Sequence, residues 1–206
     1  MPKVLSKAGQ NRQFLQGYQL AFEPSSRKKD WYRVFELWYT AASSGHTRAQ
    51  FYVGTCYDNG LGVEQNITKA FYWYMKAARQ GHMEAQFNIG YFYRDGEVVA
   101  QDYKQAVKWF TRSAIQGDTE AQRDLGYCYF YGNGVKEDHK KAVYWYQRAA
   151  RKNDPKAIYN IGMCYLFGDG VQLSHRWAKH YFQKAVALGH KTAKKQLKKL
   201  TNAKPA

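Results

Sequence analysis

Glycine returns at a fixed interval of 36 residues along most of this chain, at Gly54, Gly90, Gly126 and Gly162. A constant period between about 20 and 50 residues is typical of stacked supersecondary units rather than of one globular core. Each unit of such a stack packs mainly on its neighbours. The interval therefore predicts a repeat protein, and both fold and function have to be argued repeat by repeat.

Further columns keep the same interval and divide each repeat into two helices. The first, which we call the A helix, carries the glycine together with an alanine and a tyrosine on one face. The second, the B helix, carries alanines and paired aromatic residues on one face. The aromatic columns are Trp73, Trp109, Trp145 and Tyr181, each followed directly by Tyr74, Phe110, Tyr146 and Phe182. A glycine inside a helix costs about 1 kcal/mol relative to alanine, so we expect close packing there, by rings of the Trp73 column.

Helix boundaries also recur with the period. Good N-cap residues precede the B helices at Asp30, Asn66, Asp102, Asp138 and Ser174, and Asp154-Pro155 reads as a cap followed by proline at the first helical position. The repeats end at residues that suit a left-handed backbone, namely Gly45, Gly81, Gly117, Asn153 and Gly189. A Gly-x-Gly-Val turn joins the two helices of a repeat, except that Val98 replaces its second glycine in one copy.

These columns together form the pattern Ala-x-x-x-Ile/Leu/Val-Gly-x-x-Tyr-x-x-Gly-x-Gly-Val, followed by Lys-Ala-x-x-Trp-Tyr-x-x-Ala-Ala-x-x-Gly. The pattern resembles the Sel1-like repeat, a relative of the tetratricopeptide repeats. The resemblance implies an all-α, right-handed α-solenoid of about five 36-residue helix-turn-helix repeats and a C-terminal capping helix. We expect one domain over 1–206, with a degenerate repeat at 8–45, repeats at 46–81, 82–117, 118–153 and 154–189, and a basic capping helix and tail at 190–206.

Composition narrows the function classes. The net charge of +16 indicates a partner with an acidic surface. We find no nucleophile motif, paired carboxylates or metal-ligand spacing, and therefore expect no catalytic residues, metal or cofactor. The first residues lack an apolar stretch and no long apolar run follows, so we expect neither a signal peptide nor a membrane span. Cysteines occupy one packing column without pairing (Cys56, Cys128 and Cys164), which predicts a reducing, cytoplasmic location.

Residues that vary on the A helices are the candidates for binding. In tetratricopeptide-like stacks this helix lines the concave face, so we expect a groove there for a peptide or partner protein, in an adaptor, regulator or inhibitor. Asn88 and Asn160 match the position at which peptide-binding tetratricopeptide domains hydrogen-bond a ligand backbone. An amide both donates and accepts, and tyrosine rings supply contact area. The full predicted set is Phe51, Tyr52, Phe87, Asn88, Tyr91, Asp124, Tyr127, Tyr131, Tyr159 and Asn160.

The alternative is binding of single-stranded nucleic acid through basic and aromatic surfaces. A basic column runs along the B helices at Lys76, Arg112, Arg148 and Lys184. The A-helix groove argues against this function, because it contains acidic residues such as Glu84 and Asp124 and has no basic column. We expect the basic column to face outward as a solvated stripe.

Overall fold

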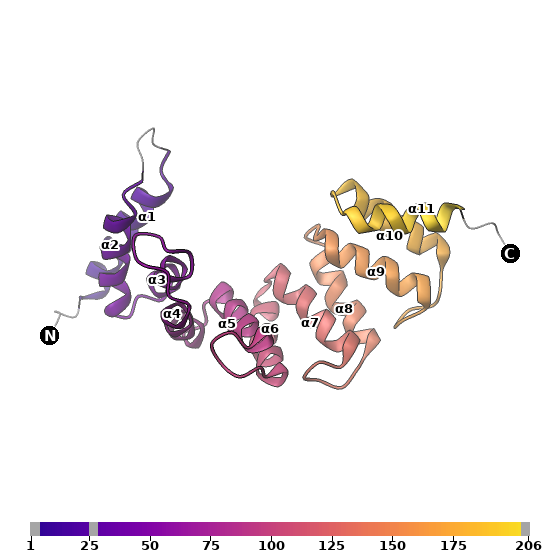
Figure 1. The fold of residues 1–206 in the computed structure, drawn as a ribbon, viewed down its shortest axis with the longest axis horizontal. Helices are drawn as coiled ribbons and strands as arrows, with labels where there is room; N and C mark the ends of the chain where they lie inside the picture. The colour runs from indigo at the N-terminus through magenta and orange to yellow at the C-terminus, as the bar shows by residue number, and fades with distance from the viewer. Residues whose placement is uncertain (1–4, 25–28, 203–206) are drawn as a thin grey trace. The chain divides into compact units, whose positions relative to one another are not determined.

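The computed structural model describes residues 5–24 and 29–202, which fold into eleven α-helices without any strand (Figure 1). Residues 1–4, residues 25–28 within the predicted degenerate repeat, and residues 203–206 of the predicted tail lie outside the described residues. The helices are α1 (Lys7–Phe22), α2 (Trp31–Ser43), α3 (Thr47–Asn59), α4 (Ile67–Arg79), α5 (Met83–Asp95), α6 (Tyr103–Gln116), α7 (Thr119–Tyr131), α8 (His139–Ala150), α9 (Pro155–Phe167), α10 (His175–Ala187) and α11 (Lys191–Asn202). The predicted all-α repeat fold is confirmed.

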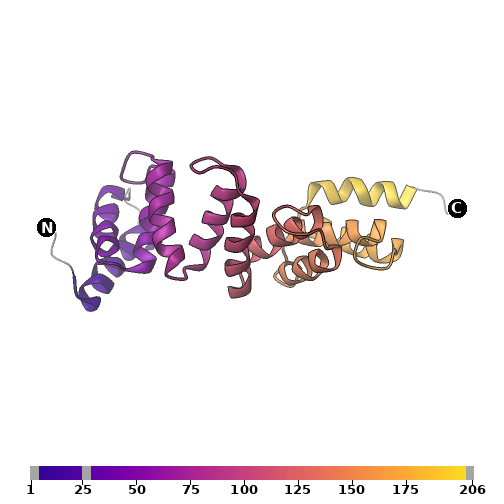
Figure 2. The ribbon, with the colours of Figure 1, turned by 90° about the horizontal axis from the view of Figure 1, so that it is seen from below.

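The chain forms two compact units, residues 1–101 and 102–206. In the first unit α1 packs on α2, α2 on α3, α3 on α4, and α4 on α5. In the second unit the same order runs from α6 to α11. Within each unit, consecutive helices lie side by side in both views (Figures 1 and 2). Helices α3, α5, α7 and α9 are the A helices of the four repeats, and α4, α6, α8 and α10 are their B helices. Helices α1 and α2 are the A and B helices of the degenerate first repeat, and α11 follows α10 in the place of a further A helix.

The predicted helix caps are confirmed. The side chains of Asp30, Asn66, Asp102, Asp138 and Ser174 each accept a hydrogen bond from the backbone N–H three residues later. This bond satisfies one of the donors that a helix start leaves unpaired. The repeat-ending residues adopt positive φ, from 61° at Asn153 to 108° at Gly117. Local sequence therefore sets where each helix begins and ends.

The prediction that the Trp73 column packs on the repeated glycines is wrong. At Gly54, Gly126 and Gly162 the ring on the glycine belongs to the next residue of the B helix, namely Tyr74, Tyr146 and Phe182 respectively. A Cβ at Gly54 would lie 2.6 Å from Tyr74 Cδ1. Adjacent helical residues differ by about 100° in direction, so only one of two neighbouring rings can enter the A–B interface. The Trp73 rings instead lie beside the basic column, with Lys76 Nζ 4.9 Å from the Trp73 ring centroid.

The second glycine of each turn packs against the previous repeat. A Cβ on Gly134 would lie 2.3 Å from the backbone oxygen of Tyr103, at the start of the preceding B helix, and Gly170 meets His139 in the same way. Only glycine allows this approach, and these glycines also have positive φ. Val98 stands at this position in the second repeat. Among the described residues other than glycine, only Asn153 has a positive φ. Val98 therefore does not adopt the backbone conformation of the glycine that it replaces.

Buried glutamines link the repeats, a feature that sequence reasoning missed. Gln50, Gln86 and Gln122 are at most 5% exposed, and the Nε2 of each donates to the carbonyl oxygen of the residue eight positions earlier. That residue lies near the end of the preceding B helix, where carbonyl groups lack helical partners. Each glutamine therefore closes the short connection between two repeats.

The cysteine column is confirmed as packing. Cys56, Cys128 and Cys164 are buried and form no disulfide within the described residues, and Phe92 is buried at the matching position. Burial raises the pKa of the Cys56 and Cys164 thiols to about 12. Within the described ranges, no helix has the length and apolar character to cross a membrane.

Candidate functional site

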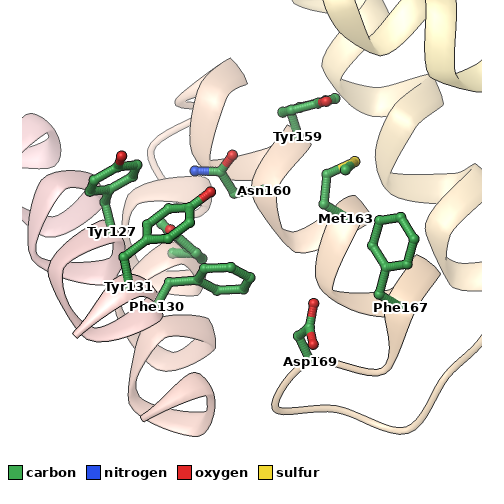
Figure 3. A pocket seen from close by; sticks show the side chains of 9 residues that line it. Tyr127, Phe130, Tyr131, Tyr159, Asn160, Met163, Phe167 and Asp169 are labelled. Carbon is green, nitrogen blue, oxygen red and sulfur yellow. The ribbon is translucent and has the colours of Figure 1, made fainter. Parts of the chain in front are cut away.

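A pocket of about 380 Å³ lies in the second unit between the A helices α7 and α9 (Figure 3). Its walls are mainly aromatic, and the buried Tyr146 of α8 lies between them. The lining residues are Tyr127, Phe130, Tyr131, Tyr146, Tyr159, Asn160, Met163, Phe167 and Asp169. Repeat packing alone does not require so many rings at a surface, because exposed apolar patches are costly in water.

Helix α7 supplies one wall. Tyr127 and Tyr131 are one helical turn apart, with ring centroids separated by 4.5 Å, and are 47% and 57% exposed. Phe130 lies against Tyr131 and stacks on His139 at 4.6 Å between centroids. The stack fixes Phe130, while the two tyrosines leave large ring faces and polar hydroxyl groups accessible.

Helix α9 supplies the opposite wall. Tyr159, Asn160, Met163 and Phe167 share one helical face because they are spaced by one, three and four residues. In Figure 3 the Asn160 amide points across the pocket toward the tyrosines of α7. Asn160 is half-buried, and Phe167 is 62% exposed at the rim. The wall therefore combines apolar contact with one group that can both donate and accept hydrogen bonds.

Asp169 carries the only formal charge among the lining residues. It lies in the turn after α9, and its carboxylate points into the space between the Phe130 and Phe167 rings (Figure 3). Its Oδ1 is 3.6 Å from His139 Nδ1, while the other nitrogen of this imidazole is 3.2 Å from Glu137 Oε1. Two carboxylates thus share one imidazole, which leaves at least one negative charge at this end of the pocket whether His139 is protonated or neutral.

Four of the predicted site residues meet in this pocket: Tyr127, Tyr131, Tyr159 and Asn160. Asp124 does not line it, and its carboxylate instead accepts from Arg123 Nε at 3.0 Å. The predicted binding set does not contain the other five lining residues, namely Phe130, Tyr146, Met163, Phe167 and Asp169. The signal for Asp169 was available, because the middle residue of the Gly-x-Gly turn varies between repeats in the way that groove positions do.

The five predicted residues of the first unit occupy different surroundings. Phe51 stacks on His82 at 4.5 Å, and Tyr52 stacks on Trp38 at 4.6 Å within an aromatic cluster of α1, α2 and α3. Phe87 is half-buried on α5. Phe51 and Tyr52 therefore act mainly in packing between helices, although both keep part of their surface exposed.

Asn88 and Tyr91 both have partners within the first unit. The Asn88 side chain lies near the Tyr74 hydroxyl, which donates to Asp58 Oδ2 at 3.1 Å. Burial raises the pKa of Tyr74, so the hydroxyl keeps its proton. The guanidinium of Arg94 lies over the Tyr91 ring, 4.2 Å from the centroid.

At four joints within the two units, the edge of one helix contacts the residue just before the next helix but one through a matched pair. In three places the pair is an aromatic ring and a histidine: Phe14 with His46, Phe51 with His82, and Tyr159 with His190. At the same place between α7 and α9 the pair is Arg123 and Asp154, with Nη1 3.1 Å from Oδ2. Burial lowers the pKa of the three histidines, which favours the neutral imidazole in these stacks.

The described residues contain no group of three histidine, cysteine or acidic side chains that could hold a metal ion. His139 and His175 occupy the same position in successive repeats, and neither belongs to such a group among the described residues.

A family model described as Sel1 repeat matches residues 47–82, 84–118, 119–154 and 155–190. Among solved structures, the chain is 32% identical to c5321, a protective antigen of uropathogenic Escherichia coli strains that displays an SLR fold. The TM-score is 0.85, and the match covers 93% of this chain and 41% of that chain. The present chain therefore spans less than half the length of that protein.

A Sel1 repeat protein from Oxalobacter formigenes is also 32% identical, with a TM-score of 0.82 over 94% of this chain and 78% of that chain. Immunity protein Pa5087 from Pseudomonas aeruginosa is 22% identical, with a TM-score of 0.53 over 92% of this chain and 69% of that chain, and shares the fold. No curated protein sequence matches the chain.

Proposed function

The chain belongs to the Sel1 repeat family, and from this premise we propose that it is a non-enzymatic protein-interaction module whose A-helix groove binds an extended segment of a partner protein. Sel1 repeat proteins generally mediate protein–protein interaction. The observation that carries the proposal is the pocket between α7 and α9, which offers exposed tyrosine rings beside the Asn160 amide. Rings provide contact area at low entropic cost, and an amide recognises a peptide bond.

The two predicted asparagines have different surroundings. Asn88 lies near the Tyr74 hydroxyl within the first unit. Asn160 lines the pocket and points toward its opposite wall (Figure 3). We therefore place the main contact with the partner backbone at Asn160, and assign Asn88 a secondary role. In this proposal the chain acts as an adaptor, a regulator or an inhibitor of its partner. A partner with an acidic surface would suit the chain's net charge of +16.

The test is selection of a random peptide library on the full chain, followed by affinity measurements on the enriched peptides by fluorescence polarisation. Asn160→Ala should weaken binding by about tenfold, because a lost hydrogen bond to a partly desolvated amide is worth roughly 1 to 2 kcal/mol. Tyr131→Ala should weaken binding similarly. Tyr32→Ala is the matched control, since Tyr32 is a 68% exposed tyrosine on α2 in the other unit. Peptides that bind all three variants as tightly as the natural chain would refute the site.

A second candidate function rests on the B helices. Arg112 lies over the Trp109 ring at 4.5 Å, and Arg148 lies 5.5 Å from the Trp145 centroid. Cations and ring faces together suit single-stranded nucleic acid. Filter binding with single-stranded RNA and DNA at two salt concentrations tests this function, because phosphate contacts weaken steeply as salt increases. No retention at the lower salt concentration rejects it.

A further inference from the structure

The pocket between α7 and α9 has an unusual charge for this protein. The chain carries 32 lysines and arginines, yet none of them lines the pocket, and its one charged lining residue is Asp169. In the described part of the chain, no lysine or arginine lies over the rings of Tyr127, Phe130, Tyr131 or Tyr159. Salt screens more distant charges over about 10 Å, so the local carboxylate governs what the pocket attracts.

In the first unit, a tyrosine ring and a carboxylate together hold an arginine side chain of the protein itself. On α5 the Arg94 guanidinium lies 4.2 Å from the Tyr91 ring centroid. Asp95 holds the same guanidinium through two contacts, 2.6 Å from Nε to Oδ1 and 3.2 Å from Nη2 to Oδ2. A tyrosine face and a carboxylate together thus bind an arginine side chain in this fold.

The second unit keeps the ring but loses the internal cation. Tyr127 occupies the column of Tyr91, while Phe130 stands in the column of Arg94 and Tyr131 in that of Asp95. The carboxylate comes instead from Asp169, in the turn after the next A helix. The substitutions leave an aromatic enclosure with a negative charge and with no arginine of its own.

Resting on the proposed function, we propose that this pocket receives an arginine side chain of the bound partner segment, with the guanidinium against the tyrosine rings and Asp169 as its counter-ion. A planar guanidinium both stacks on rings and pairs with a carboxylate. An apolar side chain would shield the Asp169 carboxylate from water and add no partner to its 3.6 Å contact with His139, which is costly. The volume of about 380 Å³ is near the lower end for ligand pockets and suits one side chain rather than a large cofactor.

The experiment uses the full chain and two blocked amino acids of nearly the same shape, N-acetyl-arginine methylamide and N-acetyl-citrulline methylamide. Citrulline replaces the guanidinium by a neutral urea group. Titration is followed by the NMR signals of the Tyr127 and Tyr131 rings and of the Asn160 side-chain amide. The arginine compound should shift these signals saturably, with an affinity at least about fivefold higher than that of the citrulline compound, as for a partly exposed cation–π and ion pair. Equal or tighter binding of citrulline overturns the proposal.

Two variants separate direct contact from general charge. Asp169→Asn should weaken the arginine compound by about fivefold and leave the citrulline compound unchanged. The turn accepts asparagine, because Asn133 occupies the same position one repeat earlier. Glu137→Gln removes an equal charge beside His139 but outside the pocket lining, and should leave both affinities within about twofold. Equal losses in the two variants overturn the proposal.

Failure of this proposal is distinguishable from failure of the proposed function. Selected peptides that depend on Asn160 but lack arginine, and that bind Asp169→Asn normally, would overturn the arginine assignment and retain the groove. Peptides that ignore Asn160, Tyr131 and Asp169 alike would overturn both.

Discussion

Replacement of Gly126 by alanine should destabilise the protein, although alanine is the better helix former. A Cβ at this position would lie 2.7 Å from both Cδ1 and Cε1 of Tyr146, and 3.2 Å from the carbonyl oxygen of Ala142. Ordinary carbon–carbon contacts are about 3.5 to 4.0 Å, so the ring would have to move by roughly 0.8 Å or more. Tyr146 is 2% exposed and Ala142 O belongs to the backbone, so neither can move freely.

The magnitude follows from two opposing effects. Overpacking of a filled interface costs about 1 to 3 kcal/mol, and the rigid neighbours here place Gly126→Ala near the upper end. Better helix propensity returns about 1 kcal/mol. The free energy of unfolding should therefore fall by roughly 2 kcal/mol, which lowers the melting temperature by about 4 to 8 °C in a chain of this size.

Thermal unfolding followed by circular dichroism measures the effect. Gly9→Ala in α1 is the matched control, because a Cβ there would meet its nearest atom, Leu5 Cβ, at an ordinary 3.4 Å. That variant should be as stable as the natural chain or more stable by up to about 1 kcal/mol. A Gly126→Ala protein that melts at or above the temperature of the natural chain would refute the packing argument.

Three further predictions concern the joints and the core. The single variants Arg123→Phe and Asp154→His should each destabilise the chain, because each breaks the ion pair between these residues. The double variant recreates the ring–histidine stack found at other joints, so a double-mutant cycle should show a coupling free energy of about 0.5 to 1.5 kcal/mol in favour of the double variant. Burial lowers the pKa of His82 below its usual 6.5, so the unfolded state binds more protons than the folded state, and the urea midpoint should fall as the pH drops below about 6.5. The variant His82→Asn should show a smaller fall, and an unchanged dependence of the urea midpoint on pH would contradict the assignment to His82. Thiol labelling followed by mass spectrometry should find Cys56 and Cys164 unreactive in the native protein and reactive in urea, and rapid native labelling would contradict their burial.

Helix positions were predictable from the sequence because the features that set them are local. A cap such as Asp102 needs only the backbone three residues away, and a repeat-ending glycine needs only its own φ. The ring that covers Gly126 was not predictable, since Trp145 and Tyr146 are adjacent and the angle between two helices decides which one enters the interface.

The pocket was predictable only in part for a related reason. The period shows which face of α7 holds Tyr127 and Tyr131, and that face was identified correctly as exposed. It does not show how far apart two A helices lie, nor that a turn residue such as Asp169 reaches between them. Binding of a partner by these residues stays a prediction.

The pairs between successive A helices bear on how such a chain can change by duplication. A ring faces a histidine at three joints, and Arg123 faces Asp154 at a fourth. If the third repeat were copied to stand before a repeat that begins with histidine, its half-buried Arg123 would lose its carboxylate and face an imidazole that favours the neutral form. Arg123 thus restricts which repeat can follow its own, so a rearrangement that moves this repeat has to keep a carboxylate at the start of the next one.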